Sequence, residues 1–581
     1  MFFPLAKFAE NQIFATLKYK KIFRIVKKLF SLLIGLIFLF ALAGSGKLYP
    51  YNIKNGGVYY VAPWGNDSNP GTINFPWKTI QHAADMVKAG DTVYIREGTY
   101  NEQVYISIEG NENDYILFSA YMEEKPVIDG KNAEGTGVII NSKYFKFIGI
   151  DVCNWSDTGI WIINSSNIEI RSCKVCNVFY GISVADGTHD FVFENLELYN
   201  FTLYGIDASP SGGKDCYNGM FINCATHSAS DISQNVDGFA LGHGNQQNFS
   251  FIGCESYDVF DGFDISAKNT TLSRCSAHHC WNSGYKLWED NITLVNCLGY
   301  GNGITNAELD WDGKEGKILL QNCDFVDAKI YNIWVENSLD SLWMYNCILA
   351  GGNNIGLAFE ERSVENYHGD YNIFHNDNAD RAISVAYTDE FSLNDIEKGG
   401  WNIYSRQDAN SLVCLDIDSL FISLENWDFH LKEGSIAIDA GTPYNAPQVD
   451  YDGTPRPQGD NYDIGAYEYI KEKGDVELYI GAGINSELRE EKDYGFGYVI
   501  GVYNGKNETI NASYYVSFNV MGKEHNQSGE FNIPSHMIMG EAFFIISFSK
   551  IKVYLEAGGK EKTREGFVVM GLVIFSTSTF T

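Results

Sequence analysis

The sequence has little positive charge. Its 581 residues include 42 Lys and Arg against 74 Asp and Glu, which gives a formal net charge of −32 at pH 7. Because a protein that binds nucleic acid needs a basic surface for the phosphates, this balance excludes nucleic acid as a partner. An acidic protein also repels an acidic ligand, and a divalent cation is the simplest bridge between the two.

An apolar run long enough to cross a membrane is lacking at the N-terminus. The run at residues 29–43 is shorter than the ~20 residues of a spanning helix. It follows a basic stretch, residues 18–28, and precedes small residues at 41–44, a layout typical of a secretory signal peptide. We therefore predict that residues 1–46 are a signal segment cleaved near Ala43 rather than a permanent anchor. The mature protein is then secreted or held at the cell surface, with no stable membrane span.

Helical periodicity is absent from about residue 92 to 440. Short β-branched and aromatic runs alternate there with Asn, Gly and Asp, which predicts strands and turns. A hydrophobic content of 45% excludes global disorder. One short helix is predicted earlier, with Thr79 as its N-cap, an apolar face, and Gly90 as its end. We expect this helix to cover the open end of a sheet.

A short phrase, Gly followed by an aromatic residue or Ile, recurs along this region. Gly238, Gly262 and Gly284 are separated by 24 and 22 residues, and a repeat of this length predicts the stacked coils of a solenoid. The phrase occurs at Gly159, Gly181, Gly205, Gly238, Gly262 and Gly284. We expect these glycines to lie in one line along a right-handed parallel β-helix that spans residues 58–470.

A second ladder consists mostly of cysteines with steps of 21 to 30 residues. Its positions are Cys173, Leu196, Cys224, Cys254, Cys275, Cys297, Cys323 and Cys347. Inward-facing Cys in a solenoid acts as a small hydrophobic residue, so we predict packing rather than metal binding for this ladder. Cys173 with Cys176, and Cys275 with Cys280, are pairs that could form disulfides, and the sequence does not decide between the states.

The remaining segments are assigned as follows. Residues 301–317 are predicted as a longer turn that projects beside the coil of Lys286, and residues 427–469 as a closing segment. Asp450, Asp452 and Asp463 in this segment fit turn chemistry better than a second calcium site. A charged linker precedes residues 476–581, whose alternation of apolar and polar residues predicts a small β-sandwich-like accessory domain.

The repeated phrase collects Asp and Lys at matching positions. Stacked coils rise by roughly 4.8 Å, so Asp264 should lie directly beside Lys286, with Asp237 and Asp261 stacked in the neighbouring column. Carboxylates that converge in this way repel one another and predict a hard cation with oxygen ligands, for which Ca²⁺ fits better than Mg²⁺. Side-chain alternation places Trp288 on the face of Lys286, either as a platform for sugar or as a packing residue.

A resemblance to a known family rests on three phrases. They are Asn235-Val236-Asp237-Gly238-Phe239, Phe260-Asp261-Gly262-Phe263-Asp264 and Gly284-Tyr285-Lys286. These resemble the two calcium-binding phrases and the lysine phrase of the pectate lyases of polysaccharide lyase family 9. Phe260 departs from the pattern, because it stands where the family has a further Asp ligand.

The resemblance implies a secreted, calcium-dependent enzyme that cleaves polygalacturonate-type uronans by β-elimination. Residue by residue, it implies calcium ligands at Asp237, Asp261 and Asp264, with Lys286 as the base. Asp207, in the column of Asp264, or Asp258 could compensate for Phe260. We expect a monomer whose partner is an acidic polysaccharide, with no cofactor other than Ca²⁺.

Two further functions remain open at this point. One is a non-catalytic, cell-surface β-helix that binds carbohydrate, which the departure at Phe260 favours. The other is a uronate C5-epimerase, which abstracts the same proton and returns one from the other face. The fold alone does not choose among these functions. A zinc site at His278-His279 is not expected, because adjacent side chains of a strand point to opposite faces.

Overall fold

The computed structural model describes residues 56–471, except 210–212, 243, 310–316, 337–340, 353–354, 361–362 and 378–379, and the backbone of strands between 476 and 573. The chain divides into two compact units, Met1–Tyr469 and Ile470–Thr581. The predicted signal segment, residues 1–46, lies outside the described residues. None of the helices in the described part is long and apolar enough to span a bilayer.

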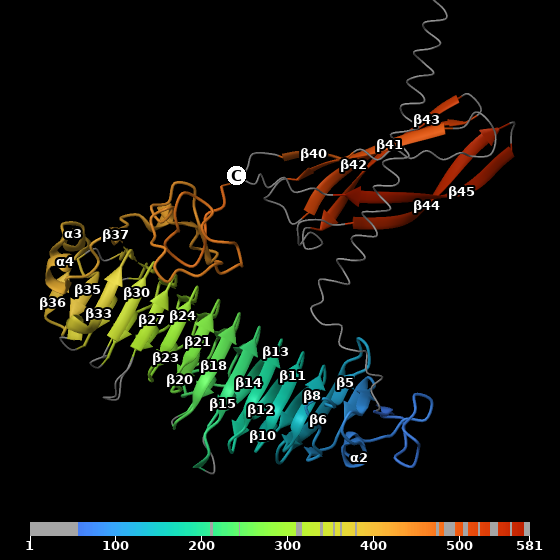
Figure 1. Ribbon diagram of the computed structural model, residues 1–581, viewed down its shortest axis with the longest axis horizontal. Helices are drawn as coiled ribbons and strands as arrows, with labels where there is room; N and C mark the ends of the chain where they lie inside the picture. Colours follow the sequence, from blue (N-terminus) through green and yellow to red (C-terminus); the bar gives the residue numbers. More distant parts are fainter. Residues whose placement is uncertain are drawn as a thin grey trace, which may run out of the picture. The chain divides into compact units, whose positions relative to one another are not determined.

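The first unit is a solenoid whose strands stack in parallel, rung upon rung (Figure 1). One of its faces is a sheet of 13 strands. In order of pairing these are β1 (Val58–Val61), β2 (Thr92–Ile95), β5 (Ile116–Ala120), β8 (Lys143–Ile148), β11 (Ser166–Arg171), β13 (His189–Glu194), β15 (Tyr217–Ile222), β18 (Gln247–Ile252), β21 (Thr270–Ser273), β24 (Ile292–Val295), β27 (Lys317–Gln321), β30 (Ser341–Tyr345) and β33 (Tyr367–Asp370).

The other faces are built from two parallel series of strands that share the long strands β12 and β14. The series that carries the candidate site contains β4 (Val104–Ile106), β7 (Val138–Ile140), β10 (Thr158–Ile163), β12 (Lys174–Ala185), β14 (Glu197–Ala208), β17 (Asp237–Leu241), β20 (Phe263–Ile265), β23 (Ser283–Leu287), β26 (Thr305–Leu309), β29 (Tyr331–Val335), β32 (Ile355–Phe359) and β35 (Ile383–Val385). The preceding series contains β3 (Gly98–Tyr100), β6 (Pro126–Ala133), β9 (Asp151–Trp155), β16 (Ala225–His227), β19 (Glu255–Tyr257), β22 (Ser276–His278), β25 (Leu298–Tyr300), β28 (Asp324–Val326), β31 (Ile348–Ala350), β34 (Ile373–Phe374) and β37 (Leu412–Val413).

The predicted line of glycines is confirmed. A Cβ atom on Gly159 would lie 2.8 Å from the carbonyl oxygen of Gly181, and one on Gly262 would lie 2.5 Å from that of Gly284. Gly181, Gly205 and Gly238 contact the next glycine of the line in the same way. The repeated phrase therefore marks a corner where successive coils approach too closely for a side chain.

The Cys ladder lies inside the solenoid, as predicted. Each of its eight members is at most 2% exposed. The residue before each Cys turns the chain inward with a left-handed backbone, as Asn296, Asn322 and Asn346 show with φ of 49°, 53° and 53°. Asn tolerates this conformation better than most residues, which explains the recurring Asn-Cys pair.

Neither of the two cysteine pairs considered from the sequence is bonded. Cys176 instead forms a disulfide with Cys153, its partner one coil earlier, while Cys173, Cys275 and Cys280 are free and buried. The register pairs Cys153 with Cys176 in strands β9 and β12, so the bond joins adjacent rungs.

The predicted turn at residues 301–317 is wrong in part. Residues Thr305–Leu309 form β26, which continues the stack above β23 with Thr305 opposite Ser283. Asn306 takes the glycine position there, and its amide points inward to donate to the Val326 carbonyl and to Asn332 Oδ1. An inward-pointing amide thus replaces the glycine corner, and only residues 310–316 lie outside the described part of this segment.

The helix predicted near the N-terminus is α2 (Ile80–Met86). The Thr79 side chain accepts a hydrogen bond from the His82 N–H, so Thr79 is the N-cap, as predicted. The carboxylate of Glu102 accepts from the Ile80 and Gln81 N–H groups and satisfies two more donors of the first turn. The helix packs its Ile80, Ala83 and Ala84 face into the solenoid core.

At the other end, a short hairpin and two helices follow the coils. These are β36 (Asp389–Phe391), antiparallel to β35, with α3 (Leu393–Glu397) and α4 (Gly400–Ser405); two 3₁₀ turns, Ser363–Asn366 and Ile417–Ser419, flank this region. Trp401 of α4 is fully buried, and its indole N–H donates to Asp408. These elements therefore extend the core beyond the last parallel rung.

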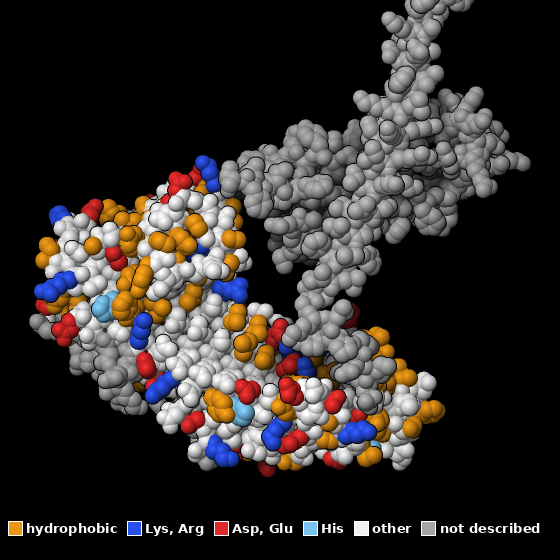
Figure 2. Space-filling model, in the orientation of Figure 1, with side chains coloured by type: hydrophobic (Ala, Val, Ile, Leu, Met, Phe, Trp, Pro, Cys, Tyr) orange, Lys and Arg blue, Asp and Glu red, His pale blue; other side chains and the backbone are white. Residues whose placement is uncertain are grey.

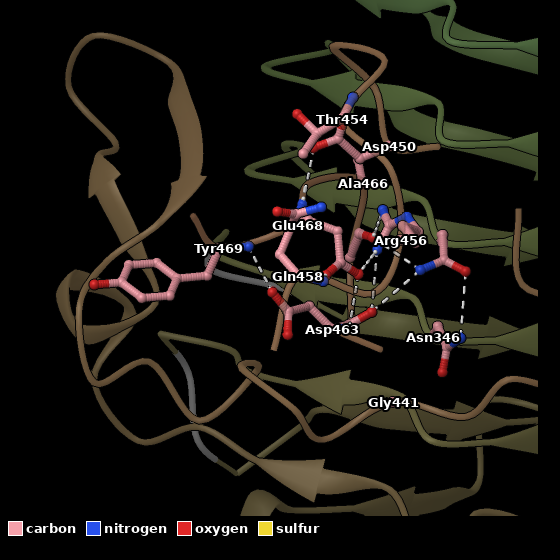
Figure 3. A network of polar contacts seen from close by, with 12 residues as sticks. Asn346, Gly441, Asp450, Thr454, Arg456, Gln458, Asp463, Ala466, Glu468 and Tyr469 are labelled. Carbon is pink, nitrogen blue, oxygen red and sulfur yellow. Dashed lines mark hydrogen bonds and ion pairs between the residues drawn. The ribbon is translucent and has the colours of Figure 1, made fainter. Parts of the chain in front are cut away.

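The closing segment folds back over the outer surface of the late coils. Its β38 (Phe421–Ser423) and β39 (Asp428–Leu431) form an antiparallel pair, and Phe421, Phe429 and Ile464 pack with Leu298 of β25 in a separate apolar cluster. The buried guanidinium of Arg456 pairs with Glu468 at 2.8 Å (Figure 3). It also donates to Asn296 Oδ1 at 3.2 Å.

The aspartates of this segment serve the turns, as the sequence predicts. Asp450 accepts from the Thr454 and Glu468 N–H groups, and Asp463 accepts from the Tyr469 N–H (Figure 3). Asp463 also accepts from the Asp439 N–H. Asp452 instead pairs with His430. Their carboxylates are thus engaged by the protein's own donors.

Acidic and basic side chains are interspersed on the solenoid face seen in Figure 2. Ion pairs join neighbouring rungs of the 13-stranded sheet, among them Lys146 with Glu169 and Arg171 with Glu194. The excess of negative charge is therefore not gathered on this face.

In the second unit, the backbone forms two antiparallel groups of strands. They are β40 (Val476–Ile480), β41 (Tyr494–Tyr503), β42 (Thr509–Val520) and β43 (Lys523–Pro534) in one sheet, and β44 (Phe544–Ala557) with β45 (Lys560–Val573) in another. The β-sandwich-like arrangement of residues 476–581 stays a prediction.

The glycine line generates the first testable prediction. Gly181→Ala should destabilise the solenoid by roughly 1–3 kcal/mol, because the new methyl group would collide with the Gly205 carbonyl. Thermal unfolding followed by circular dichroism measures the loss. Gly242→Ala is the matched control, since its nearest neighbour is the movable Ser209 hydroxyl at 3.1 Å. Equal melting temperatures for the two variants would contradict the close approach of the coils.

Candidate functional site

The candidate site lies on the outer surface of strands β17, β20, β23 and β26. The register places Ala240, Asp264, Lys286 and Glu308 at equivalent positions of successive rungs. Lys286 is therefore flanked by a carboxylate on either side, at the spacing of adjacent strands. The predicted juxtaposition of Asp264 and Lys286 is confirmed.

The neighbouring column contains the other two predicted aspartates. The Gly238 N–H donates to the Asp261 carbonyl, so Asp237 and Asp261 occupy matching positions on adjacent coils, as expected. Asp261 Oδ1 accepts from the Asn282 amide at 2.8 Å and from the Ser283 N–H at 2.9 Å. Its Oδ2 lies 3.6 Å from Lys286 Nζ, so Asp261 links the two columns.

Glu308 is a member of the site that the sequence reasoning missed. Its Oε2 accepts a 2.6 Å hydrogen bond from the Ser283 hydroxyl, and Thr305 in turn donates to Ser283 at 2.9 Å. The signal for it was present, because Asp264, Lys286 and Glu308 follow one another at intervals of 22 residues. The coil of Glu308 lacks the Gly-aromatic phrase, so this 22-residue spacing was not recognised from the phrase alone.

Burial dominates the electrostatics of these carboxyl groups. It raises the pKa of Asp237 to about 8, with the negative charges of Asp264 and Asp261 adding to the effect. Burial likewise raises the pKa of Asp264 to about 7 and that of Glu308 to about 7, in each case against the opposing charge of Lys286. The charged forms are therefore costly here without a compensating cation.

Lys286 stays charged in this environment. Burial lowers its pKa, but the carboxylates of Asp261, Asp264, Glu308 and Asp237 together outweigh burial and raise it above the ordinary value. The ammonium group also lies 4.6 Å from the centre of the Trp288 ring. Trp288 therefore shares the face of Lys286, as predicted, and contacts it directly.

Two observations bear on whether this site fits a cation. Asp237 Oδ1 and Asp261 Oδ2 are buried without a hydrogen-bond donor, and oxygens in this state suit a hard cation such as Ca²⁺. Over the described residues, however, no three His, Cys, Asp or Glu side chains converge as a metal-binding group. The donor chemistry fits Ca²⁺, and a bound ion would need further oxygen ligands from outside these side chains.

Asp207 lies farther along the same line. Ala240 separates it from Asp264, so it is two rungs away from that carboxylate. Burial raises the pKa of Asp207 to about 7, and its Oδ1 has no hydrogen-bond donor. Asp258, the other residue considered as compensation for Phe260, is exposed in a left-handed turn. The metal role of Asp207 stays a prediction.

The two histidines beside the site meet, contrary to expectation. His279 has a left-handed φ of 53°, which breaks the alternation of the strand and brings its Nδ1 within 2.8 Å of His278 Nδ1. The other nitrogen of His278 contacts Glu255 at 3.1 Å. The ring of His278 is thus engaged at both nitrogens.

Comparison with known proteins agrees with this architecture. Residues 59–323 match the family model of the Pel9A-like, right-handed β-helix region. The chain is 26% identical to pectate lyase PEL9 of Emericella nidulans over 261 residues, which cover 44% of this chain and 58% of that enzyme. It is 22% identical to pectate lyase L of Dickeya dadantii, over 71% of this chain and 90% of that enzyme.

A solved structure is also similar. Pectate lyase Pel9A aligns with 72% of this chain and 97% of its own at a TM-score of 0.47 and 17% identity. The coil geometry and the matched region define a right-handed parallel β-helix protein with an acidic, lysine-containing site on its outer surface. The chain is thus a parallel β-helix protein whose residues 59–323 are similar to the Pel9A-like β-helix region.

The buried carboxyl groups generate a prediction about pH. In the presence of EDTA, the melting temperature should fall as the pH rises from 5 to 8.5, because the folded state holds the proton of Asp237 up to a pKa of about 8 while the unfolded state releases it near 4. Asp237→Asn cannot titrate, so it should lose less stability over this range and be a few degrees more stable than the wild type at pH 8.5. A steeper decline in the variant would contradict the assignment.

Proposed function

We propose that the chain is a lyase that cleaves polygalacturonate-type acidic polysaccharides by β-elimination. The observation that carries this proposal is the position of Lys286, which lies on the outer face of the solenoid between Asp264 and Glu308 with Asp261 at 3.6 Å. A lysine surrounded by mostly buried carboxyl groups is a group whose proton affinity responds to bound charge. The named activities of the curated relatives support the same reaction class.

The reaction requires a base at C5 of a uronate ring. In its neutral form, the Lys286 amine takes the C5 proton, the electrons of that bond form the C4–C5 double bond, and the C4–O4 bond breaks. The departing O4 keeps the electron pair of the C4–O4 bond and takes a proton from water, and the Lys286 ammonium returns its proton to the hydroxide that is left. The products are one new reducing end and one unsaturated uronate, with the amine regenerated.

Calcium has a defined task in this proposal. Asp237, Asp261 and Asp264 would each contribute oxygen ligands to it, and it would supply the positive charge that stabilises the negative charge developing at C5. The buried oxygens without donors on Asp237 and Asp261 support this ligand set. Substrate and water oxygens would complete the shell, in keeping with the six to eight ligands that Ca²⁺ prefers.

The protonation state of Lys286 depends on the charge of the neighbouring carboxyl groups. With four carboxyl groups around it, the raised pKa keeps the amine protonated and unable to act as a base. A cation bound to the carboxylates would cancel the negative charge that raises the pKa of Lys286. The remaining effect on Lys286 is burial, which lowers its pKa.

A second function has one observation in its favour. The resemblance puts Phe260 where the family has a further Asp ligand, and in this chain the Phe260 ring stacks on Trp281 with 5.1 Å between the ring centres. A non-catalytic, cell-surface β-helix that binds carbohydrate would tolerate this change more readily than an enzyme. Incubation with polygalacturonate, with and without Ca²⁺, separates the two, because β-elimination produces an unsaturated uronate that absorbs ultraviolet light. A calcium-dependent rise in absorbance is expected, and no rise on any calcium-loaded uronan would leave the binding function.

The metal assignment predicts a difference in thermal stability. A ligand that binds only the folded state stabilises it, so Ca²⁺ should raise the melting temperature of the wild type and raise that of Asp261→Asn much less. Asp452→Asn, on the closing segment, serves as the control and should respond as the wild type does. Equal shifts in Asp261→Asn and the wild type would place the cation elsewhere.

The base assignment predicts the behaviour of two lysine variants. Lys286→Ala should reduce kcat by at least about a thousandfold while the protein stays folded, since the side chain is partly exposed. Lys286→Arg should be nearly inactive as well, because a guanidinium remains protonated at any working pH. Initial rates of ultraviolet absorbance measure both. Substantial turnover by Lys286→Arg would show that the positive charge, and not a proton acceptor, is what the site uses.

A further inference from the structure

The corner beside the candidate site carries an aromatic platform. We infer that Trp281, whose indole packs against the Phe260 ring, is a stacking subsite for a pyranose ring of the polysaccharide, next to the ring that binds at Lys286. This inference rests on the proposed function for the identity of the polysaccharide. It is independent of whether Lys286 performs chemistry.

The support of the indole is the first observation. Phe260 and Trp281 occupy matching positions on successive coils, because the Asn282 N–H donates to the Phe260 carbonyl and the Trp281 N–H to the Val259 carbonyl. Their ring centres are 5.1 Å apart and their planes differ by 23°. One face of the indole is thus fixed against a second aromatic ring, which holds it in a single orientation.

The other face of the indole is the second observation. The Gly303 N–H donates to the Cys280 carbonyl, which brings Gly303 over Trp281 on the next coil. A Cβ at Gly303 would collide with the Trp281 carbonyl, so this position has no side chain with which to cover the ring. Trp281 is accordingly 48% exposed, a large value for a tryptophan in the middle of a solenoid.

Continuity with the acidic site is the third observation. Asn282, the next residue, donates from its side chain to Asp261 Oδ1 at 2.8 Å, and the other oxygen of Asp261 lies 3.6 Å from Lys286 Nζ. The platform therefore borders the charged columns directly. A sugar chain with one uronate at Lys286 can place a neighbouring ring on the indole.

The chemistry of the platform selects its occupant. A rigid, exposed indole face offers apolar contact without charge, which suits the flat C–H face of a pyranose. The carboxylate groups of the polysaccharide would bind instead at the site of Lys286 and the cation. This also gives Phe260 a role. An aspartate at that position could not support the indole, whereas the Phe260 ring packs against it.

The test measures binding without turnover. In the Lys286→Ala background, isothermal titration with a galacturonate oligosaccharide gives the dissociation constant. Adding Trp281→Ala should weaken binding by about tenfold, and Trp281→Phe should retain most of the affinity because it preserves a stacking face. Trp64→Ala, a change at a tryptophan that is 63% exposed in the N-terminal loop, is the matched control and should bind unchanged. Melting temperatures check that each variant is folded.

Each outcome decides the subsite separately from the enzyme. Unchanged affinity in Trp281→Ala, or a loss in Trp281→Phe as large as in Trp281→Ala, would overturn the platform. Absence of any binding by the Lys286→Ala protein with Trp281 intact would also overturn it. Lyase activity of the wild type together with unaffected binding in Trp281→Ala would leave the enzyme and remove the subsite. An inactive wild type that binds through Trp281 would leave the subsite and remove the enzyme.

Discussion

The backbone hydrogen bonds between successive coils are the constraint on which the rest of the structure depends. They hold equivalent residues one strand spacing apart, so a side chain is placed by its position in the coil and not by its distance along the chain. The glycine corner fixes the register of the strands on either side of it, because the carbonyl of each next coil occupies the place of a Cβ. Asp264, Lys286 and Glu308 form a line because their coils cannot slip.

That regularity also concentrates charge in a way that a less repetitive fold would avoid. Asp237, Asp261, Asp264 and Glu308 are all mostly buried near one lysine, and a single ammonium group cannot neutralise four carboxylates. Burial therefore raises the pKa values of Asp237, Asp264 and Glu308, and their charged forms are costly without a compensating positive charge.

The features that could be predicted from the sequence are those that repeat. The coil period, the glycine line, the inward cysteines and the pairing of Asp264 with Lys286 all follow from matching residues at regular intervals. Glu308 was not predicted as part of the site, because Asn306 replaces the glycine of the repeated phrase on its coil and points its amide inward. The contact between His278 and His279 depends on one left-handed residue, which strand periodicity cannot show. The disulfide joins cysteines outside the inward ladder, and the closing segment touches coils more than 140 residues earlier.

The buried Arg456 connects parts of the chain that the solenoid alone leaves independent. Each coil contacts only its neighbours, so a bare stack could lose its last rungs one at a time. Arg456 reaches Asn296 while pairing with Glu468, and Asn322 and Asn346 donate to the same returning segment at Gly465 and Thr442. Opening these coils would remove the packing and hydrogen bonds around the buried Arg456–Glu468 pair. The last rungs and the segment that covers them should therefore unfold together. The coils that carry Lys286 and Glu308 lie next to this cooperative block, and it shields them from fraying at the C-terminal end of the stack.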